Sequence, residues 1–286
     1  MPLAESVVKR FATLNPFPQP DFLYIDAPVV LMHGFGLMSS FRRGGMLNEA
    51  ALHLRAHGVA AFAPNVAPYQ TVPIRAALWK DRIEMVLDQT RAKHVHLIAH
   101  SMGGLDARYL ITNLEMHAQV ASLTTVSTPH RGTELACFVL QQPERLRTWT
   151  NDLANWLGAT TFDETDADFI RAVSELTPEY LNAEFNPSVP DHPDVAYFSY
   201  AGCTGKGTTA SISPYLMPFN GMLYQREGIN DGFVSRASAM WGTYRGDLGA
   251  DHVMQVATPL GFKTTFDTNG FYTQVVHELA EAFNQV

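Results

Sequence analysis

The chain has 286 residues, of which 46% are hydrophobic and 17% charged, and its formal net charge is -8 at pH 7. This amount of apolar material can form a large buried core, which excludes a disordered chain. The acidic balance argues against nucleic acid as a partner, and no apolar run reaches the ~18 residues of a membrane span. Lys9 and Arg10 stand where a secretory signal would carry its apolar segment, so we expect a cytoplasmic protein unless a leader was removed.

The first half of the chain alternates between strand and helix patterns. Short apolar runs predict strands at 29–32, 59–63, 95–99 and 120–126, and stripes of apolar residues predict helices at 45–57, 71–91 and 103–111. A further strand is expected at 195–201 and a closing amphipathic helix at 271–283. Such alternation is typical of an α/β fold, a mostly parallel sheet with helices on both faces.

The strand pattern stops between residues 133 and 190, where aromatic residues stand in helical or irregular surroundings. We therefore expect an α/β core of residues 1–132 and 191–286, with an inserted helical cap or lid at 133–190. A chain of this length fits one compact domain that carries an insertion.

A serine stands where the third predicted strand meets the next helix, in the sequence Ala99-His100-Ser101-Met102-Gly103. This is the context of a nucleophile elbow, in which strand and helix approach so closely that the residues two before and two after the serine must be small. Ala99 replaces the usual first glycine and is still small. The alternative is a serine that only caps the helix.

A serine hydroxyl is a weak nucleophile at neutral pH and needs a base, which a third group must orient. In folds of this kind the chain order is serine, acid, histidine. His252 lies in a loop ahead of the last helix, where a catalytic histidine is expected. We prefer it to the other histidines that follow Ser101, which are His117, His130, His192 and His277.

The candidate for the acid is Asp231, in the sequence Asn230-Asp231-Gly232. These residues favour a tight turn by themselves, and a turn at a strand end can also present the acid. Asp251 is the main competitor, but neighbouring side chains on an extended segment point apart. The remaining aspartates in this part of the chain are Asp163, Asp166 and Asp168 in the expected cap, and Asp247 near His252.

Acyl transfer forms a tetrahedral oxyanion, which backbone N–H groups can stabilise. One expected donor is the N–H of Met102, directly after the serine. The second is the N–H of Phe35, in the loop His33-Gly34-Phe35-Gly36 after the first strand, where the glycines allow close approach.

Four segments resemble one known family, the bacterial true lipases (triacylglycerol lipases) of the α/β-hydrolase superfamily. They are VVLMHGFG, HLIAHSMGGLDARYL, VSTPHRGTELA and INDGFVSR, and the resemblance covers about residues 28–137 and 229–256. It implies the α/β-hydrolase fold, a catalytic triad of Ser101, Asp231 and His252, and an oxyanion hole with Phe35 and Met102 as donors.

The chain departs from this family at its calcium site. Family members bind a structural calcium through an aspartate two residues after the catalytic histidine and a glutamine four residues beyond that, and these positions are Met254 and Thr258 here. We therefore expect no metal. Family members are typically secreted and often carry a disulfide. Cys137 and Cys203 could pair in principle, but they suggest neither a disulfide scaffold nor a zinc site.

The reaction that we predict is hydrolysis of a carboxylic ester through an acyl-enzyme on Ser101, without a cofactor. The expected partner is a small-molecule or lipid ester, and a lipid interface is a second candidate contact. Candidates for an apolar trough beside the serine are Leu37, Met38, Phe138, Met217, Phe219 and Phe233, although such residues more often form plain core. A thioesterase or acyltransferase with the same triad, a peptidase and a catalytically silent interaction protein stay open as alternatives.

Overall fold

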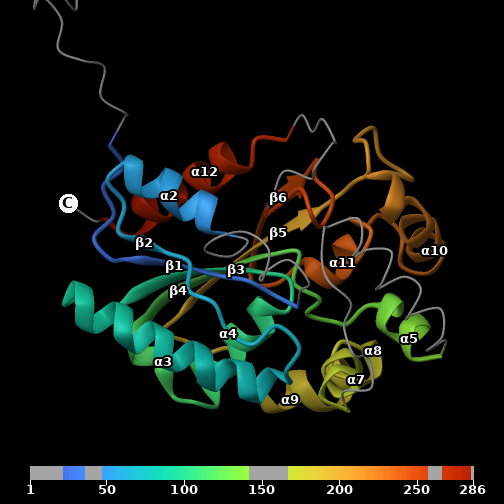
Figure 1. Ribbon diagram of the computed structural model, residues 1–286, viewed down its shortest axis with the longest axis horizontal. Coiled ribbons are helices and arrows are strands. Elements are labelled where there is room, and N and C mark those ends of the chain that lie inside the picture. The colour runs from blue at the N-terminus through green and yellow to red at the C-terminus, as the bar shows by residue number, and fades with distance from the viewer. Residues whose placement is uncertain (1–21, 36–46, 142–166, 257–265, 285–286) are drawn as a thin grey trace, which may run out of the picture.

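The computed structural model describes residues 22–35, 47–141, 167–256 and 266–284 (Figure 1). Strands in this part of the chain form one six-stranded sheet in the order β2-β1-β3-β4-β5-β6, and every neighbouring pair is parallel. The strands are β1 (Val29–Met32), β2 (Ala61–Phe62), β3 (Val95–His100), β4 (Val120–Val126), β5 (Ala196–Gly202) and β6 (Thr243–Leu248).

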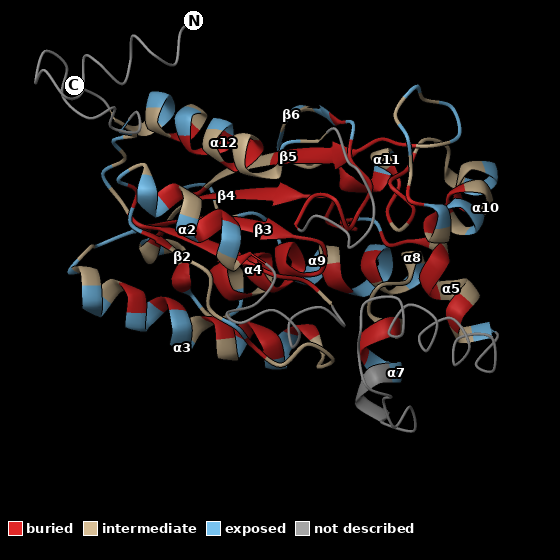
Figure 2. Ribbon diagram, turned by 45° about the horizontal axis from the view of Figure 1, so that its top comes forward, coloured by how far each residue is buried: buried red, intermediate tan, exposed pale blue. Residues whose placement is uncertain are grey.

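Helices cover both faces of the sheet, as the sequence predicts. One face carries α2 (Asn48–Ala56) and α12 (Thr268–Phe283), and the other carries α3 (Val72–Thr90) and α4 (Gly103–Thr112) (Figure 1). In β3, Ile98 packs toward α2 and α12, whereas Leu97 and Ala99 pack toward α3 and α4. This follows from the alternation of side chains along a strand. Figure 2 shows α3 and α12 buried along the side that faces the sheet and exposed along the other.

Strand β6 was not predicted from the sequence. This strand lies at the edge of the sheet, and five of its six side-chain positions are exposed or partly exposed. An edge strand with one open face carries no continuous apolar run, so the pattern that revealed the central strands was absent. The closing helix was predicted from residue 271 but begins three residues earlier, where the Asp267 side chain caps it by accepting a hydrogen bond from the N–H of Gly270.

The remaining helices gather mostly beyond the carboxyl ends of the strands (Figure 1). They are α5 (Glu134–Gln141), α7 (Ala167–Ser174), α8 (Pro178–Tyr180), η2 (Leu181–Phe185), α9 (Asn186–Ser188), η3 (Pro214–Leu216), α10 (Met217–Glu227) and α11 (Arg236–Ala239), while η1 (Met116–Gln119) leads into β4. The described parts of the expected cap, 133–141 and 167–190, are thus largely helical. The division into core and cap stays a prediction.

The sheet brings distant segments to one edge. Parallel register pairs Met32 of β1 with Ala99 of β3, so the loop after β1 emerges beside Ser101. In the described part of the chain, no helix combines the length and the apolar character that crossing a bilayer requires. Cys137 and Cys203 are both free thiols.

Candidate active site

Ser101 occupies a strained turn between β3 and α4. Its φ is 57°, a left-handed conformation that a side chain rarely adopts and that costs about 1–3 kcal/mol. Two neighbours hold the turn: the Ser101 N–H donates to the Val126 carbonyl at 2.9 Å, and the Ser101 carbonyl accepts from the Thr128 hydroxyl at 2.7 Å. The surrounding structure therefore fixes the conformation that a nucleophile elbow requires.

The loop after β1 presses against this turn. A Cβ on Gly103 would lie 2.9 Å from the His33 carbonyl oxygen, and a Cβ on Gly34 would lie 2.6 Å from the Ser101 Cβ. Real Cβ atoms do not approach that closely, so both positions need glycine for space. The requirement for a small residue two positions after the serine, expected from the sequence, is met here by close backbone contact.

Ser101, His252 and Asp231 form a hydrogen-bonded row. The Ser101 Oγ lies 2.9 Å from His252 Nε2, and His252 Nδ1 lies 2.7 Å from Asp231 Oδ2. The three side chains come from segments far apart in the sequence, and Asp231 is fully buried while Ser101 and His252 are 9% and 8% exposed. The structure thus brings together the three residues that the sequence singled out.

Asp231 is surrounded by hydrogen-bond donors. Its Oδ1 accepts from the N–H groups of Phe233 and Val234, and its Oδ2 accepts from His252 and from the Gln255 amide at 3.0 Å. Burial works to raise the pKa of this carboxyl, but the charge of His252 and the hydrogen bonds together hold it below its ordinary value. An ionised Asp231 requires the His252 proton on Nδ1, which leaves Nε2 free to accept the hydroxyl proton of Ser101.

Asp251, the competing acid, has a different task. Its Oδ2 accepts from the Ser213 hydroxyl at 2.5 Å and from the Ser213 N–H at 2.9 Å, and its Oδ1 accepts from the N–H groups of Val253 and Met254. This buried carboxylate therefore ties the loop before η3 to the turn that carries His252. Since His252 Nδ1 donates to Asp231, the histidine needs no second acid.

The other candidate histidines have partners elsewhere. His117 and His192 stack on each other with ring centroids 3.9 Å apart, His130 stacks on Trp241, and His277 is exposed on α12. The histidine beside the row is His100, whose ring lies 4.5 Å from that of His252. It is fully buried, and burial lowers its pKa well below the ordinary value, with the His252 charge adding to this. His100 is therefore neutral.

The loop that carries Phe35, one expected oxyanion donor, adjoins Met102, the other. A Cβ on Gly34 would come within 2.8 Å of the Met102 nitrogen, so the segment that carries Phe35 adjoins the start of α4. The loop is held from below by Arg75, whose Nη2 donates to the His33 carbonyl at 2.8 Å and whose guanidinium pairs with buried Asp106. The helix N-terminus adds a favourable partial positive charge for an anion here.

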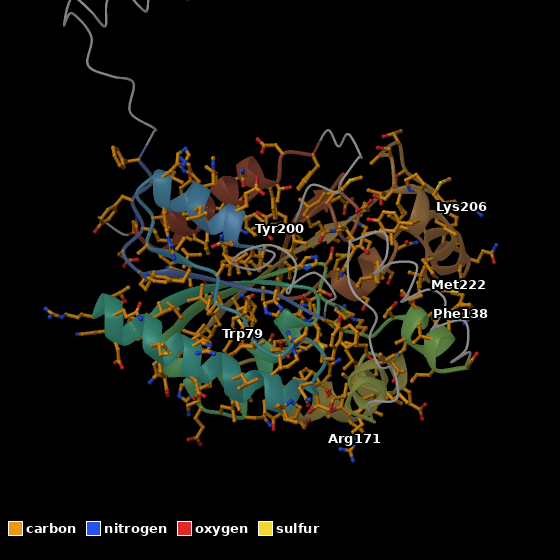
Figure 3. The ribbon with its side chains drawn as sticks, viewed as in Figure 1. Trp79, Phe138, Arg171, Tyr200, Lys206 and Met222 are labelled. Carbon is orange, nitrogen blue, oxygen red and sulfur yellow. The ribbon has the colours of Figure 1, made fainter. Side chains whose placement is uncertain are left out.

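Four aromatic side chains from the expected apolar trough or the oxyanion loop share one cluster. Phe35, Phe138, Phe219 and Phe233 pack with the buried residues of α5 and α10, which include Leu135, Val139 and Leu223. Figure 3 shows Phe138 on α5 beside Met222 on α10. Met217 is 57% exposed and is not part of this cluster. Leu37 and Met38 lie outside the described residues.

The described residues near His252 do not fit a calcium ion, and Thr258, the position of the family's glutamine, lies outside them. The position of the family's aspartate is Met254, which is 2% exposed and packs in the apolar core with a thioether that is a poor ligand for a hard cation. Asp251 is occupied by four hydrogen-bond donors. Among the residues that the structure describes, no three His, Cys, Asp or Glu side chains are grouped as metal ligands would be.

Two residues near the row were missed in the sequence. Gln255 donates to Asp231, and Thr128 donates to the Ser101 carbonyl. The signal for Gln255 was a polar residue inside the otherwise apolar run Val253-Met254-Gln255-Val256. Thr128 belongs to the segment VSTPHRGTELA, which carries part of the family resemblance but had no assigned role.

Comparisons with known proteins show the family to which the chain belongs. The family model described as palmitoyl protein thioesterase matches residues 28–182, which is more than half of the chain. Triacylglycerol lipase 2 of Saccharomyces cerevisiae is 31% identical over 247 residues, which cover 79% of this chain and 71% of that protein. A triacylglycerol lipase of Pseudarthrobacter phenanthrenivorans is 30% identical over 57% of this chain, a match that spans about half (54%) of the bacterial protein.

The fold has solved counterparts. The crystal structure of a Bacillus licheniformis lipase in mature form superposes with a TM-score of 0.63 at 22% identity, covering 92% of this chain and 96% of the other. A likeness at this identity concerns the fold, which is the α/β-hydrolase fold.

Proposed function

We propose that this chain, a carboxylic ester hydrolase that belongs to the palmitoyl protein thioesterase family and is related to the triacylglycerol lipases, acts through an acyl-enzyme on Ser101. The observation that carries this proposal is the row from Asp231 Oδ2 through His252 to Ser101 Oγ, with separations of 2.7 and 2.9 Å. These lie within the range in which a base can take a proton from a nucleophile.

In the proposed reaction, Ser101 Oγ attacks the ester carbonyl carbon while His252 Nε2 takes its proton. Asp231 stabilises the resulting imidazolium, and the N–H groups of Phe35 and Met102 donate to the oxyanion. The imidazolium then protonates the leaving alcohol. Water, deprotonated by the same nitrogen, attacks the acyl-enzyme and releases the carboxylic acid. In this scheme the Asp231 carboxylate stays ionised, in keeping with its lowered pKa.

We propose that the acyl chain lies against the cluster of Phe35, Phe138, Phe219 and Phe233. Phe233 links this cluster to the reacting groups, because its ring also stacks on His252. An apolar wall at this position would favour acyl chains of several carbons over acetyl, since each methylene that leaves water contributes about 0.8 kcal/mol.

We propose further that residues 133–190 form a cap over this aromatic cluster. The end of the molecule that carries the cluster then touches lipid. Ile170 on α7 is 51% exposed and Met217 at the start of α10 is 57% exposed. Apolar side chains that reach solvent near a binding wall suit a lipid surface. The enzyme should then turn over an emulsified ester faster than the same ester below its solubility limit, and equal specific rates in both forms would contradict the lipid contact.

Thioester hydrolysis is the second candidate function, because the matching family model is that of a palmitoyl protein thioesterase. The same row could attack a thioester carbonyl without any additional group. Rates on an oxyester and a thioester with the same acyl chain separate the two candidates. A kcat/KM for the thioester that exceeds that for the oxyester by tenfold or more would reverse our preference.

The test of the main proposal is a series of p-nitrophenyl esters from acetyl to palmitoyl, measured with wild type and with Ser101→Ala. We expect the rate per enzyme to rise beyond acetyl and to fall by at least about a thousandfold in the variant. Undiminished hydrolysis by Ser101→Ala would overturn the role of Ser101. A rate that collapses beyond short acyl chains would keep the reaction and overturn the acyl wall.

A further inference from the structure

We propose that Gln255 is a positioning residue for the reaction, which sets both the place and the charge of the Asp231 oxygen that faces His252. The inference rests on the proposed function, because it assigns Gln255 a role only through Asp231. Gln255 is fully buried and follows His252 by three residues, in the same turn. Its Nε2 donates to Asp231 Oδ2 at 3.0 Å and is also 3.3 Å from the Ala250 carbonyl.

The oxygen that Gln255 binds is the one that binds His252. Asp231 Oδ2 accepts from His252 Nδ1 at 2.7 Å and from Gln255 Nε2 at 3.0 Å, while Oδ1 is occupied by two backbone N–H groups. The Gln255 side chain is therefore the side-chain donor that competes with His252 for negative charge on Oδ2. Its presence tempers how strongly the carboxylate can stabilise a protonated His252.

Gly202 makes room for this contact. A Cβ at Gly202 would overlap the Gln255 Nε2, and it would lie 2.6 Å from the Asp231 Cβ and 2.7 Å from the Ala250 carbonyl oxygen. The backbone at Gly202 does not have a positive φ, so its conformation is open to other residues. Glycine is needed here for space, at the one point where the end of β5 meets both Asp231 and Gln255.

Packing alone does not explain an amide at this position. The Gln255 Oε1 is buried and has no hydrogen-bond partner of ordinary geometry among the described residues, which is unfavourable for folding; the titratable group that faces this amide is the His100 imidazole, whose pKa Gln255 works to raise. A residue of similar shape without polar atoms, such as methionine, would avoid that cost. The amide nitrogen Nε2, by contrast, donates to Asp231. This indicates that the contact with the carboxylate is the reason for an amide at this position.

Removing the donor should have two effects. Oδ2 loses one of its two fixing contacts, so the imidazole is held less firmly and kcat falls. Oδ2 then keeps His252 as its side-chain donor, so protonated His252 is favoured and the acid limb of the pH profile moves to higher pH. His100, the other imidazole against His252, does not produce this limb, because burial holds its pKa well below the ordinary value. A side chain that merely fills space would produce the first effect through disorder but not the second.

The test is the pH dependence of kcat/KM for a short ester in Gln255→Met, which keeps the shape and removes both N–H groups. We expect kcat to fall about tenfold, KM to change less than twofold, and the acid limb to rise by about 0.5 pH unit. Gln255→Leu also removes both N–H groups, leaves Gly202 and Asp231 unchanged, and should shift the limb in the same direction. This second variant keeps the test decisive if Gln255→Met does not fold.

Asn220→Leu is the matched control. Asn220 is also a buried amide, and it bonds to the Thr204 carbonyl and the Asn230 side chain beside the acid turn, not to the Asp231 carboxylate. It should lower the thermal midpoint and leave the acid limb in place. An unshifted limb in folded Gln255→Met, or in Gln255→Leu where Gln255→Met does not fold, overturns the inference on Gln255. Hydrolysis that persists in Ser101→Ala, measured alongside, overturns instead the proposed function on which it rests.

Discussion

The ring of Phe233 stacks on the imidazole of His252, with ring centroids 4.9 Å apart and planes inclined by 27°. The same residue donates its N–H to Asp231 Oδ1, and its carbonyl accepts from the Thr133 hydroxyl at 2.6 Å. One residue thus touches the proposed base, the proposed acid and the segment that leads into α5. The packing of the base therefore depends on the contact between the acid turn and the start of the expected cap.

Phe233→Ala should lower kcat/KM about tenfold on a short ester, because one face of the imidazole loses its cover and the ring gains freedom. Phe138→Ala is the matched control, since Phe138 lies in the same cluster on α5. It should spare short esters and reduce rates on long ones. Steady-state kinetics on acetyl and octanoyl esters distinguish the two variants, and identical profiles would contradict a contact of Phe233 with the base that matters for catalysis.

Thr128→Val should destabilise the protein by roughly 1–2 kcal/mol and lower kcat, because the strained Ser101 turn loses the hydroxyl that donates to its carbonyl. Thr124→Val is a close control: Thr124 is buried on β4, and its hydroxyl has no hydrogen-bond partner among the described residues. Urea denaturation measures both free energies of unfolding. If Thr124→Val costs as much as Thr128→Val, the hydroxyl does not hold the elbow.

Asp231→Asn and Asp251→Asn separate the two aspartates near His252. An asparagine at 231 no longer enforces the tautomer that accepts the serine proton, so kcat should fall by about 10³–10⁴. An asparagine at 251 weakens the tie to Ser213 and should lower the melting temperature, with kcat retained within about tenfold at 25 °C. A larger loss of kcat at position 251 than at position 231 would reassign the acid.

Glu175 should make stability depend on pH. Burial raises its pKa to about 7, although the hydrogen bond from the Val72 N–H at 2.6 Å opposes this and the Asp106 charge adds to it. The native protein therefore binds a proton between pH 4.5 and 7 that the unfolded chain releases, so this residue's contribution to stability falls as the pH rises through that window.

Glu175→Gln removes this proton linkage and keeps an oxygen that can accept from Val72. Relative to wild type, the variant should gain stability between pH 5 and pH 8. Urea unfolding at the two pH values measures the gain, and a difference between variant and wild type that is the same at both would show that Glu175 titrates normally.

Short-range sequence patterns predicted the strands, helices and turns that depend on neighbouring residues. The strand at 120–126 was predicted with its observed bounds, because both of its faces are buried and its β-branched valines and threonines favour a strand. The elbow was evident because strand, serine and helix are adjacent in the sequence. The order of serine, acid and histidine along the chain then led to residues that the fold brings within hydrogen-bond distance.

The contacts that were not predicted join residues far apart in the chain. Gln255 reaches Asp231 across 24 positions, and Thr128 reaches Ser101 across 27. Neither pair produces a periodicity or a motif. The need for glycine at 202 likewise arises only where β5 meets the turn after β6, and β6 itself was missed. The sequence thus singled out the proposed reacting groups and not the residues that hold them.

The most direct test of the central claim is labelling with a fluorophosphonate ester, followed by peptide mapping of the intact adduct by mass spectrometry. Such a reagent phosphonylates a serine only where a base has activated it. We predict one adduct per chain, located on Ser101, with labelling abolished in Ser101→Ala and slowed by at least about a hundredfold in His252→Ala. An adduct on another residue, or labelling of wild type no faster than that of His252→Ala, would contradict it.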